Sequence, residues 1–298
     1  MIGGIPYAGE WLALLTAVAW AFAVILFKKS GETVHPVALN LFKGVLATIL
    51  FVPTVYLFGE TLFYPASSGD YLLLLASGAL GIGIADSLFL KCLNLLGAGL
   101  TSIVNCVYAP FLIGFSVVWL GESLTSWQIF GVAMIIGALL IATSRRNQRQ
   151  VSRRDLALGV TLGVLAVAGT AVGIVVIKPL LNSSPLLWVT EIRLLGGLAM
   201  LGLILLFHPR RRAILSTLTV TTGWKYTVSG SFVGAYLAMV LWLAGMKFTQ
   251  VSVAGVLNQM SNIFIFVFAA IFLSEPLDAR RIIGIVLGVC GSLLMTFG

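Results

Sequence analysis

Four charged side chains lie inside long apolar runs of this 298-residue sequence: Lys43, Asp86, Glu191 and Arg193. A charge at bilayer depth costs about 2.5–3.5 kcal/mol even on insertion scales, so each needs a partner or a function. Asp86 could accept an amine or a proton, or pair with a neighbouring lysine. Lys43 and Arg193 could meet a carboxylate, or snorkel toward the interface and hold the fold. Glu191 and Arg193 are two residues apart and do not face each other on a helix.

Three amide side chains form a second group of candidates. Asn105, Asn258 and Asn262 lie within apolar runs, and Asn262 follows Asn258 by one helical turn. An amide both donates and accepts hydrogen bonds, so a pair on opposite helices could bind a polar solute. Interhelical hydrogen bonding, worth on the order of 0.6–2 kcal/mol, explains the same residues without a ligand.

Aromatic residues accompany these polar positions. The candidates for an aromatic wall are Trp20, Phe89, Tyr108, Tyr236 and Trp242. Trp20, Tyr236 and Trp242 lie well inside their runs, away from the interfacial positions that such residues usually take. A wall of aromatic groups with a few amides suits a medium-sized, partly apolar solute, although ordinary helix packing explains each residue equally well.

The elements that must position these side chains are membrane helices. Hydrophobic residues make up 59% of the chain and charged residues 9%, far below the roughly 25% charged residues of soluble domains. A spanning helix needs about 17–25 apolar residues. Ten segments meet or approach this length, and they run from Trp11–Phe27, Val37–Phe58, Tyr71–Cys92, Leu100–Leu120, Trp127–Thr143, Leu156–Ile177, Leu186–Phe207, Trp224–Met246 and Val251–Leu273 to Ile282–Phe297.

The second half of the sequence repeats the first. Leu-Gly-Glu-Ser-Leu at Leu120–Leu124 matches Leu-Ser-Glu-Pro-Leu at Leu273–Leu277, and the same offset of 153 carries Asn105 onto Asn258. Nearer the N-terminus, Lys43 matches Arg193 at an offset of 150. We therefore predict an all-α integral membrane protein of ten helices, built as two inverted five-helix repeats (1–143 and 156–298) around a central cavity. A basic linker, residues 144–155, joins the two repeats.

A proline distinguishes the two repeats. Pro110 lies inside the fourth predicted span, whereas Ile263 stands at the corresponding position of the ninth. Because proline removes a backbone hydrogen-bond donor, we expect a bend in the fourth span alone.

The distribution of positive charge predicts the orientation. With the N-terminus on one side, 14 of the 18 Lys and Arg residues fall on the opposite side, two fall on the same side, and two lie within spans. Because basic loops stay in the cytoplasm, both termini are predicted outside a bacterial inner (plasma) membrane. The sequence leaves the oligomeric state open, and a monomer is compatible with it.

Several function classes are excluded by the sequence. No Walker, HExxH or paired CxxC motif is present, so we expect no enzyme activity, no cofactor and no metal. The net charge of +8 comes from clusters between apolar runs, which we interpret as orientation signals rather than as a nucleic-acid surface. The expected partners are the lipid bilayer and a small-molecule substrate.

The ten spans, the two Leu-x-Glu-x-Leu junctions, and Pro36…Lys43 with Pro185…Arg193 resemble the EamA branch of the drug/metabolite transporter superfamily. The resemblance covers the whole chain and is greatest to bacterial amino-acid exporters, including those for aromatic amino acids. It implies that spans one to four and six to nine surround the cavity, and that Glu122 and Glu275 cap helix junctions. Lys43 departs from the family pattern, which more often has Arg.

We therefore expect a secondary transporter that moves amino acids or related metabolites by alternating access. The predicted lining comes from the third, fourth, eighth and ninth spans, with Asn105, Asn258, Tyr236 and Trp242 foremost. One alternative is a nucleotide-sugar or sugar-phosphate carrier, which would need more cations than Lys43 and Arg193. Another is a membrane channel or scaffold. Proton coupling through Asp86 or Glu191 and uncoupled facilitation both remain open.

Overall fold

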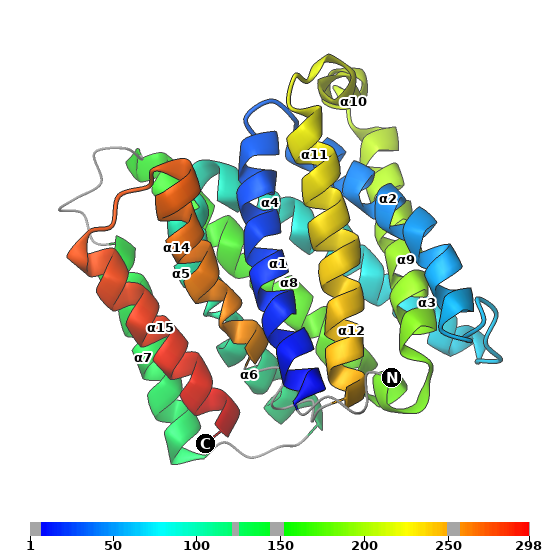
Figure 1. Ribbon diagram of the computed structural model, residues 1–298, viewed down its shortest axis with the longest axis horizontal. Helices are drawn as coiled ribbons and strands as arrows, with labels where there is room; N and C mark the ends of the chain where they lie inside the picture. Colours follow the sequence, from blue (N-terminus) through cyan, green and yellow to red (C-terminus); the bar gives the residue numbers. More distant parts are fainter. Residues whose placement is uncertain (1–6, 121–124, 144–151, 249–256, 298) are drawn as a thin grey trace.

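The computed structural model describes residues 7–120, 125–143, 152–248 and 257–297, and their regular structure is entirely helical (Figure 1). The helices, with π-helical segments labelled η, are α1 (Ala8–Ser30), α2 (Pro36–Leu57), α3 (Ser68–Gly78), η2 (Ala79–Ala85), α4 (Asp86–Leu96), α5 (Ala98–Asn105), α6 (Tyr108–Leu120), α7 (Ser126–Thr143), α8 (Arg153–Ser183), α9 (Leu186–Phe207), α10 (Arg211–Val220), α11 (Trp224–Gly230), η4 (Ser231–Leu237), α12 (Ala238–Phe248), α14 (Ser261–Leu273) and α15 (Ala279–Phe297).

Among the described residues, seven helices are long and apolar enough to cross a membrane. They are Ala8–Ser30, Pro36–Leu57, Ser68–Leu96, Ala98–Trp119, Arg153–Leu181, Leu186–Phe207 and Trp224–Gly245. Two shorter apolar helices, Ser126–Ala142 and Leu257–Leu273, and the 19-residue α15 overlie the remaining predicted spans. Residues 251–256 of the predicted ninth span lie outside the described residues. The multi-pass helical fold is as expected, while the count of ten spans stays a prediction.

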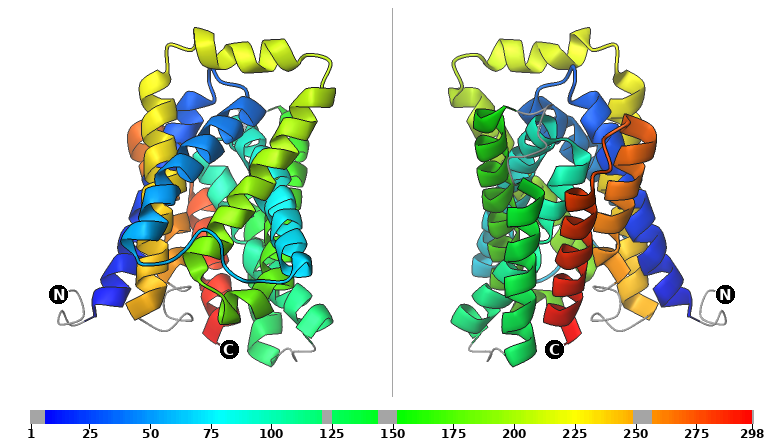
Figure 2. Two further views of the ribbon diagram at one scale, coloured as in Figure 1. Left: turned by 90° about the vertical axis from the view of Figure 1, so that its right-hand side faces the viewer. Right: turned by 90° about the vertical axis from the view of Figure 1, so that its left-hand side faces the viewer.

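The long helices form one bundle. α7 and α15 pack on each other at one edge, whereas α1 packs against α12 and α14 nearer the centre (Figure 1). η2 packs on α8 and α9, and η4 packs on α1 and α2. α1 begins and α15 ends at the same end of the bundle, and α10 lies across the opposite end (Figure 2). α10 was not predicted, because its mixed residues carry no long apolar run.

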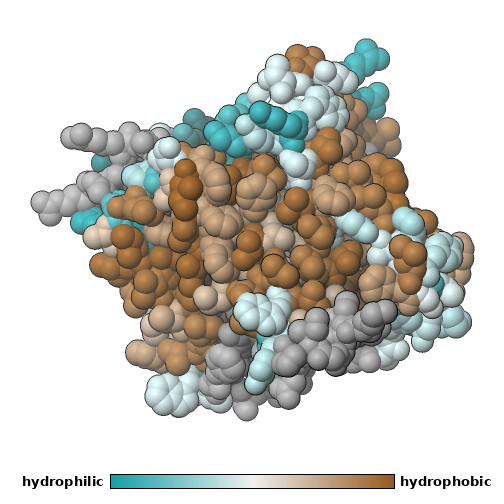
Figure 3. Space-filling model, viewed as in Figure 1, coloured by the Kyte–Doolittle hydropathy of each residue, from teal (hydrophilic) through white to brown (hydrophobic). Residues whose placement is uncertain are grey.

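A broad belt of hydrophobic side chains crosses the middle of the bundle on the face shown in Figure 3. In Figure 3 the belt covers the visible face, and hydrophilic residues gather at the end that carries α10. Apolar residues within the helices also face outward, such as Ile49 of α2 and Leu165 of α8, which are 61% and 53% exposed. Apolar patches of this extent are rare on soluble proteins, so the surface fits the acyl chains of a bilayer.

Local signals in the sequence explain where several helices begin. His35 precedes Pro36, the first residue of α2, and its Nδ1 accepts a hydrogen bond from the Val37 amide at 3.3 Å. Partial burial, together with Lys91 and His208, lowers the pKa of His35, which keeps Nδ1 available as an acceptor. Ser67 and Asp70 form a capping box at α3, and Ser152 caps α8.

Two predicted spans are interrupted at corresponding positions. The fourth breaks at a turn of Cys106 and Val107 between α5 and α6, and the segment 257–273 breaks at Met260. With the offset of 153, position 107 falls on 260. The expectation that Pro110 bends only the fourth span is wrong: Pro110 lies in the first turn of α6, where its missing N–H removes no helical bond.

Candidate functional site

Lys43 and Asp86 form an ion pair inside the bundle. Lys43 lies on α2 and Asp86 begins α4, directly after the π-helical η2, and the Lys43 ammonium contacts Asp86 Oδ2. The Lys43 side chain is 8% exposed and that of Asp86 is 29% exposed. The Lys43 ammonium also lies 5.9 Å from the centre of the Phe27 ring. The pair therefore compensates both charges and leaves Asp86 partly accessible.

Asn40, one turn before Lys43, fixes the geometry of this pair. Its amide nitrogen donates to the carbonyl oxygens of Ile82 and Gly83, at 2.7 and 3.1 Å, and to Ser87 Oγ at 3.0 Å. A π-helix bonds residue i to i+5 and often occurs at functional sites. Asn40 thus binds the last turn of η2 just before Asp86. Asn40 was not predicted as a site residue, although its amide within an apolar run of the sequence could have identified it.

Arg193 approaches the same region from α9. Its Nε donates to Ser77 Oγ at 3.1 Å, and Ser77 in turn donates to the Gly173 carbonyl at 2.7 Å. The guanidinium extends along η2, where a Cβ on Gly81 would lie 3.4 Å from Nη2. Tyr108 and Asp86 lie in the surroundings of the Arg193 guanidinium. Lys43, Asp86, Arg193 and Tyr108 therefore form one polar group, which we call the central cluster. Ser77 was not predicted.

The amide side chains meet where the two spans are interrupted. Asn105, the last residue of α5, donates through Nδ2 to Asn262 Oδ1 at 3.0 Å, and Asn262 donates to Gln259 Oε1 at 3.3 Å. Asn105 is thus joined to Asn262 rather than to Asn258, its sequence equivalent. Asn258 lies one turn before Asn262 and takes no part in these bonds. Gln259 joins the group without having been predicted, because its neighbours depend on the break at Met260.

Of the predicted aromatic residues, Trp20 lies near the central cluster. Its ring centre is 6.5 Å from that of Phe27, over which Lys43 lies, and 6.3 Å from that of Phe89 on α4. Phe89 follows Asp86 by three residues and shares its face of the helix. These rings give the accessible side of the Lys43–Asp86 pair an apolar flank.

Tyr236 and Trp242 lie in a different place. Tyr236 shares a hydrogen bond of 2.8 Å with Thr54 on α2, and its ring centre is 5.6 Å from that of Phe51. Both residues pack on a cluster of buried apolar side chains from α2, α9 and α12, which we call the α2–α9 cluster; its core is Ala47, Phe51, Val55, Leu187, Leu194 and Leu243. The predicted site residues are therefore divided between two regions.

Glu191 lies beside the α2–α9 cluster and away from the hydrogen bonds of the central cluster. It is four residues after Leu187 and three before Leu194, so the three side chains share one face of α9. Glu191 is 4% exposed, and its Oε2 has no hydrogen-bond partner among the described residues. Arg193 points to Ser77 instead, as the spacing of the two residues predicts.

Two further carboxylates bind helix N-termini, where the helix dipole favours negative charge. Glu275 accepts hydrogen bonds from the Ala98 and Gly99 amides at 2.7 and 2.9 Å, so it caps α5 from the other half of the chain. Gly97, at φ 82°, makes the turn that admits this carboxylate. Glu60 similarly accepts from Leu187 and Trp188 of α9. Glu122, the other expected cap, lies outside the described residues.

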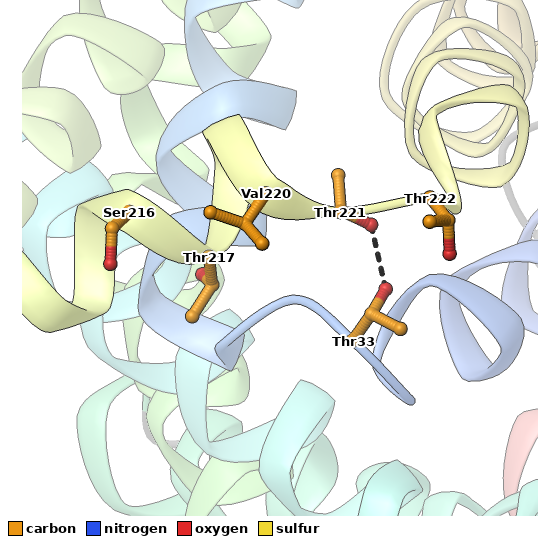
Figure 4. Close-up of a pocket in the computed structure, with 6 residues that line it drawn as sticks. All are labelled: Thr33, Ser216, Thr217, Val220, Thr221 and Thr222. Carbon is orange, nitrogen blue, oxygen red and sulfur yellow. Dashed lines mark hydrogen bonds between the residues drawn. The ribbon is translucent and has the colours of Figure 1, made fainter.

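A pocket of about 410 Å³ opens near α10, and its lining residues are Thr33, Ser216, Thr217, Val220, Thr221 and Thr222 (Figure 4). The hydroxyls of Thr33 and Thr221 share a 2.7 Å hydrogen bond. The lining carries no charged side chain, so the pocket offers only neutral hydroxyls. Across the described ranges, no three His, Cys, Asp or Glu side chains lie together as a metal site would require.

Comparison with known proteins identifies relatives along the whole chain. The EamA-like transporter family matches residues 7–144 and 157–297. A protein of Archaeoglobus fulgidus, named as an uncharacterized transporter, is 23% identical over 284 residues, which cover 95% of this chain and 96% of that protein. One crystal structure shares the fold at a TM-score of 0.67 and 16% identity, over 96% of each chain.

Proposed function

The chain belongs to the EamA-like transporter family, and we propose that it is a secondary transporter that moves amino acids or related small metabolites across the plasma membrane by alternating access. The observation that carries the proposal is the central cluster: compensated charges of both signs at bilayer depth, with Asp86 partly accessible. A zwitterionic amino acid offers an ammonium to a carboxylate such as Asp86 and a carboxylate to a cation such as Arg193. The cluster suits such a solute better than one of a single sign.

Inverted repeats are the architecture that we propose for this transport. Three observations support it: the family match falls on both halves, η2 and η4 correspond to within one residue at the offset of 153, and both interrupted spans break at the corresponding position. Each π-helical segment also packs on helices of the other repeat: η2 packs on α8 and α9, and η4 packs on α1 and α2. With an odd number of spans in each repeat, residues 1–143 and 156–298 are inverted relative to each other, and both termini lie outside.

Alternating access is supported by the interrupted spans. Transporters commonly place their site at discontinuous helices, whose broken ends leave backbone and side-chain polar groups for the substrate. Asn105 ends α5 at such a break, and Gln259 and Asn262 flank the other. We propose that the Asn105–Asn262 bond opens during transport and that Asn105 and Asn258 then bind the substrate, with Trp20 and Tyr108 beside it.

The alternatives have less support. A nucleotide-sugar carrier needs several cations for phosphate groups, whereas the central cluster offers two, Lys43 and Arg193, and Asp86 already compensates Lys43. A channel needs an open polar path, but apolar clusters and bonded amides occupy the interior of the described bundle. A carrier requires breakable contacts between its halves, such as the amide contact between Asn105 and Asn262.

Flux into proteoliposomes tests the substrate site. With a panel of labelled amino acids, we expect saturable uptake by the wild type and loss of uptake in the double variant Asn105→Ala/Asn258→Ala, which still inserts and elutes as a folded protein. Asn94→Ala is a matched control, because this amide binds the Gly31 carbonyl at the bundle end. Unchanged saturable uptake by the double variant would remove these amides from the site.

A further inference from the structure

Glu191 is a buried carboxyl that the proposed substrate site does not use. Its side chain lies between Leu187 and Leu194 on the face of α9 that packs with α2. Oε2 has no hydrogen-bond partner among the described residues, and the Thr48 hydroxyl, on the face of α2 between Gly44 and Phe51, is likewise buried without one. Gly44 lies against Leu198 of α9, so that face of α2 packs on α9.

Among the described residues, Glu191 has no cation to compensate an ionised form in this conformation. The charged and titratable groups nearest to α9 inside the bundle have other partners: Lys43 contacts Asp86, Arg193 donates to Ser77, and Tyr236 is hydrogen-bonded to Thr54. The remaining groups lie toward the helix ends: Tyr71 donates to the Tyr64 carbonyl, Glu60 accepts from the start of α9, Arg211 donates to the Leu206 carbonyl, and Lys178 is exposed on α8. An isolated carboxylate in apolar surroundings is so costly that the group takes up a proton instead.

Glu191 lies nearer one end of the bundle than the other. It is the fifth residue after Leu186, which begins α9, so it lies about 7–8 Å along the helix from that end. In Figure 1 this end of α9 is the end of the bundle where α1 begins and α15 ends. If the termini are outside, as proposed, Glu191 lies in the outer half, where protons are more concentrated in an energised cell.

We propose that Glu191 is a proton-binding site that couples transport to proton movement. This inference rests on the proposed transport function. In the present conformation the carboxyl is buried and holds a proton. When α2 and α9 separate toward the cytoplasmic end during the transport cycle, water from that side reaches the carboxyl and the proton leaves as hydronium. The carboxylate then binds another proton from the outer side before the α2–α9 cluster can close again.

Proteoliposome uptake of labelled phenylalanine, leucine and lysine, with and without a pH gradient, tests the coupling. In the wild type the gradient should stimulate flux several-fold, whereas in Glu191→Gln the stimulation should vanish and exchange without a gradient should persist. Glu191→Asp keeps a carboxyl and should retain part of the stimulation. Glu32→Gln is the control, because this carboxyl lies in an exposed pair with Lys29.

Each outcome separates the two proposals. Wild-type flux that is indifferent to the gradient, or gradient-driven flux that survives in Glu191→Gln, would overturn the proton site alone. Absence of saturable flux for any amino acid would count against the proposed substrate class. Glu191 is then still tested by infrared difference spectra in lipid: a protonated-carboxyl band that titrates in the wild type and is absent in Glu191→Gln is expected. Identical spectra would contradict the proposal.

Discussion

The polar residues inside this bundle are hydrogen-bonded or ion-paired with one another in the absence of a substrate. Lys43 gives up hydration, and its compensation comes from the Asp86 carboxylate and the face of Phe27. Because one partner remains accessible to water, the pair is less costly to bury than a fully enclosed one. The same accessibility leaves Asp86 able to exchange its partner for a substrate ammonium.

Asp86→Asn tests the energetics of this pair. The substitution leaves the Lys43 ammonium buried beside Phe27 without a counter-charge, so the free energy of unfolding should fall by about 1–3 kcal/mol, less than for a fully buried pair. Adding Lys43→Met should recover part of that loss, because the orphaned charge is then gone. Thermal unfolding in detergent, arranged as a double-mutant cycle, measures both effects. Additive losses in the double variant would show that the two residues are not coupled.

Residue types alone pointed to part of this network. Lys43, Asp86 and Arg193 were identified because a charge in an apolar run is expensive wherever it lies. Their partners were not predictable, since they depend on helix rotation. Ser77 carries no signal in the sequence and yet orients Arg193. Asn105 pairs with Asn262 rather than with its repeat equivalent, because the breaks at positions 107 and 260 reset the rotation of both spans.

At the scale of the elements, close helix packing sets the positions of the polar side chains. Gly78, at the end of α3, lies so near α9 that a Cβ would overlap the Arg193 carbonyl oxygen, and a Cβ on Gly196 would overlap the Leu75 carbonyl oxygen. Small residues at such contacts let backbones approach closely in membranes. The backbone of Arg193 is thereby held against the helix that carries Ser77.

Gly78→Ala should therefore separate α3 from α9, lower the unfolding temperature in detergent and reduce transport, since the Arg193–Ser77 hydrogen bond is displaced. Gly202→Ala, also on α9, is the matched control, because a Cβ at this position would meet nothing within 4 Å. In a helix, alanine is favoured over glycine by about 1 kcal/mol, so the control should be neutral or slightly stabilised. Equal effects of the two substitutions would show that close packing at Gly78 does not position Arg193.

Helix irregularities were beyond prediction from this sequence. Residues 79–85 are small or aliphatic, and residues 231–237 are mostly apolar and include Phe232 and Tyr236. Neither composition distinguishes i to i+4 from i to i+5 bonding, so η2 and η4 carry no signal of their own. Long apolar runs, in contrast, placed the helices to within a few residues. α10 was missed because it is a short segment that begins with arginines and mixes apolar residues with serine and threonine.

The bundle carries an apolar belt on its outside, polar side chains in its interior, and further hydrophilic residues at the end with α10. The belt seen in Figure 3 fits lipid, and the arginines at the start of α10 lie at the end opposite the start of α1. We propose that the central cluster and the interrupted spans take two arrangements during transport. A bundle of this kind is suited to act as a carrier, which binds its solute and changes access.

Counterflow in proteoliposomes tests carrier action most directly. Vesicles are loaded with an unlabelled amino acid and diluted into the same amino acid in labelled form. A carrier should then accumulate label transiently above the outside concentration, because the unlabelled amino acid inside competes with the label for the binding site and slows its exit. We expect this overshoot for at least one amino acid with both an ammonium and a carboxylate, and its loss when either group is blocked. Uptake that only equilibrates, with no overshoot at any internal concentration, would contradict alternating access and indicate a channel.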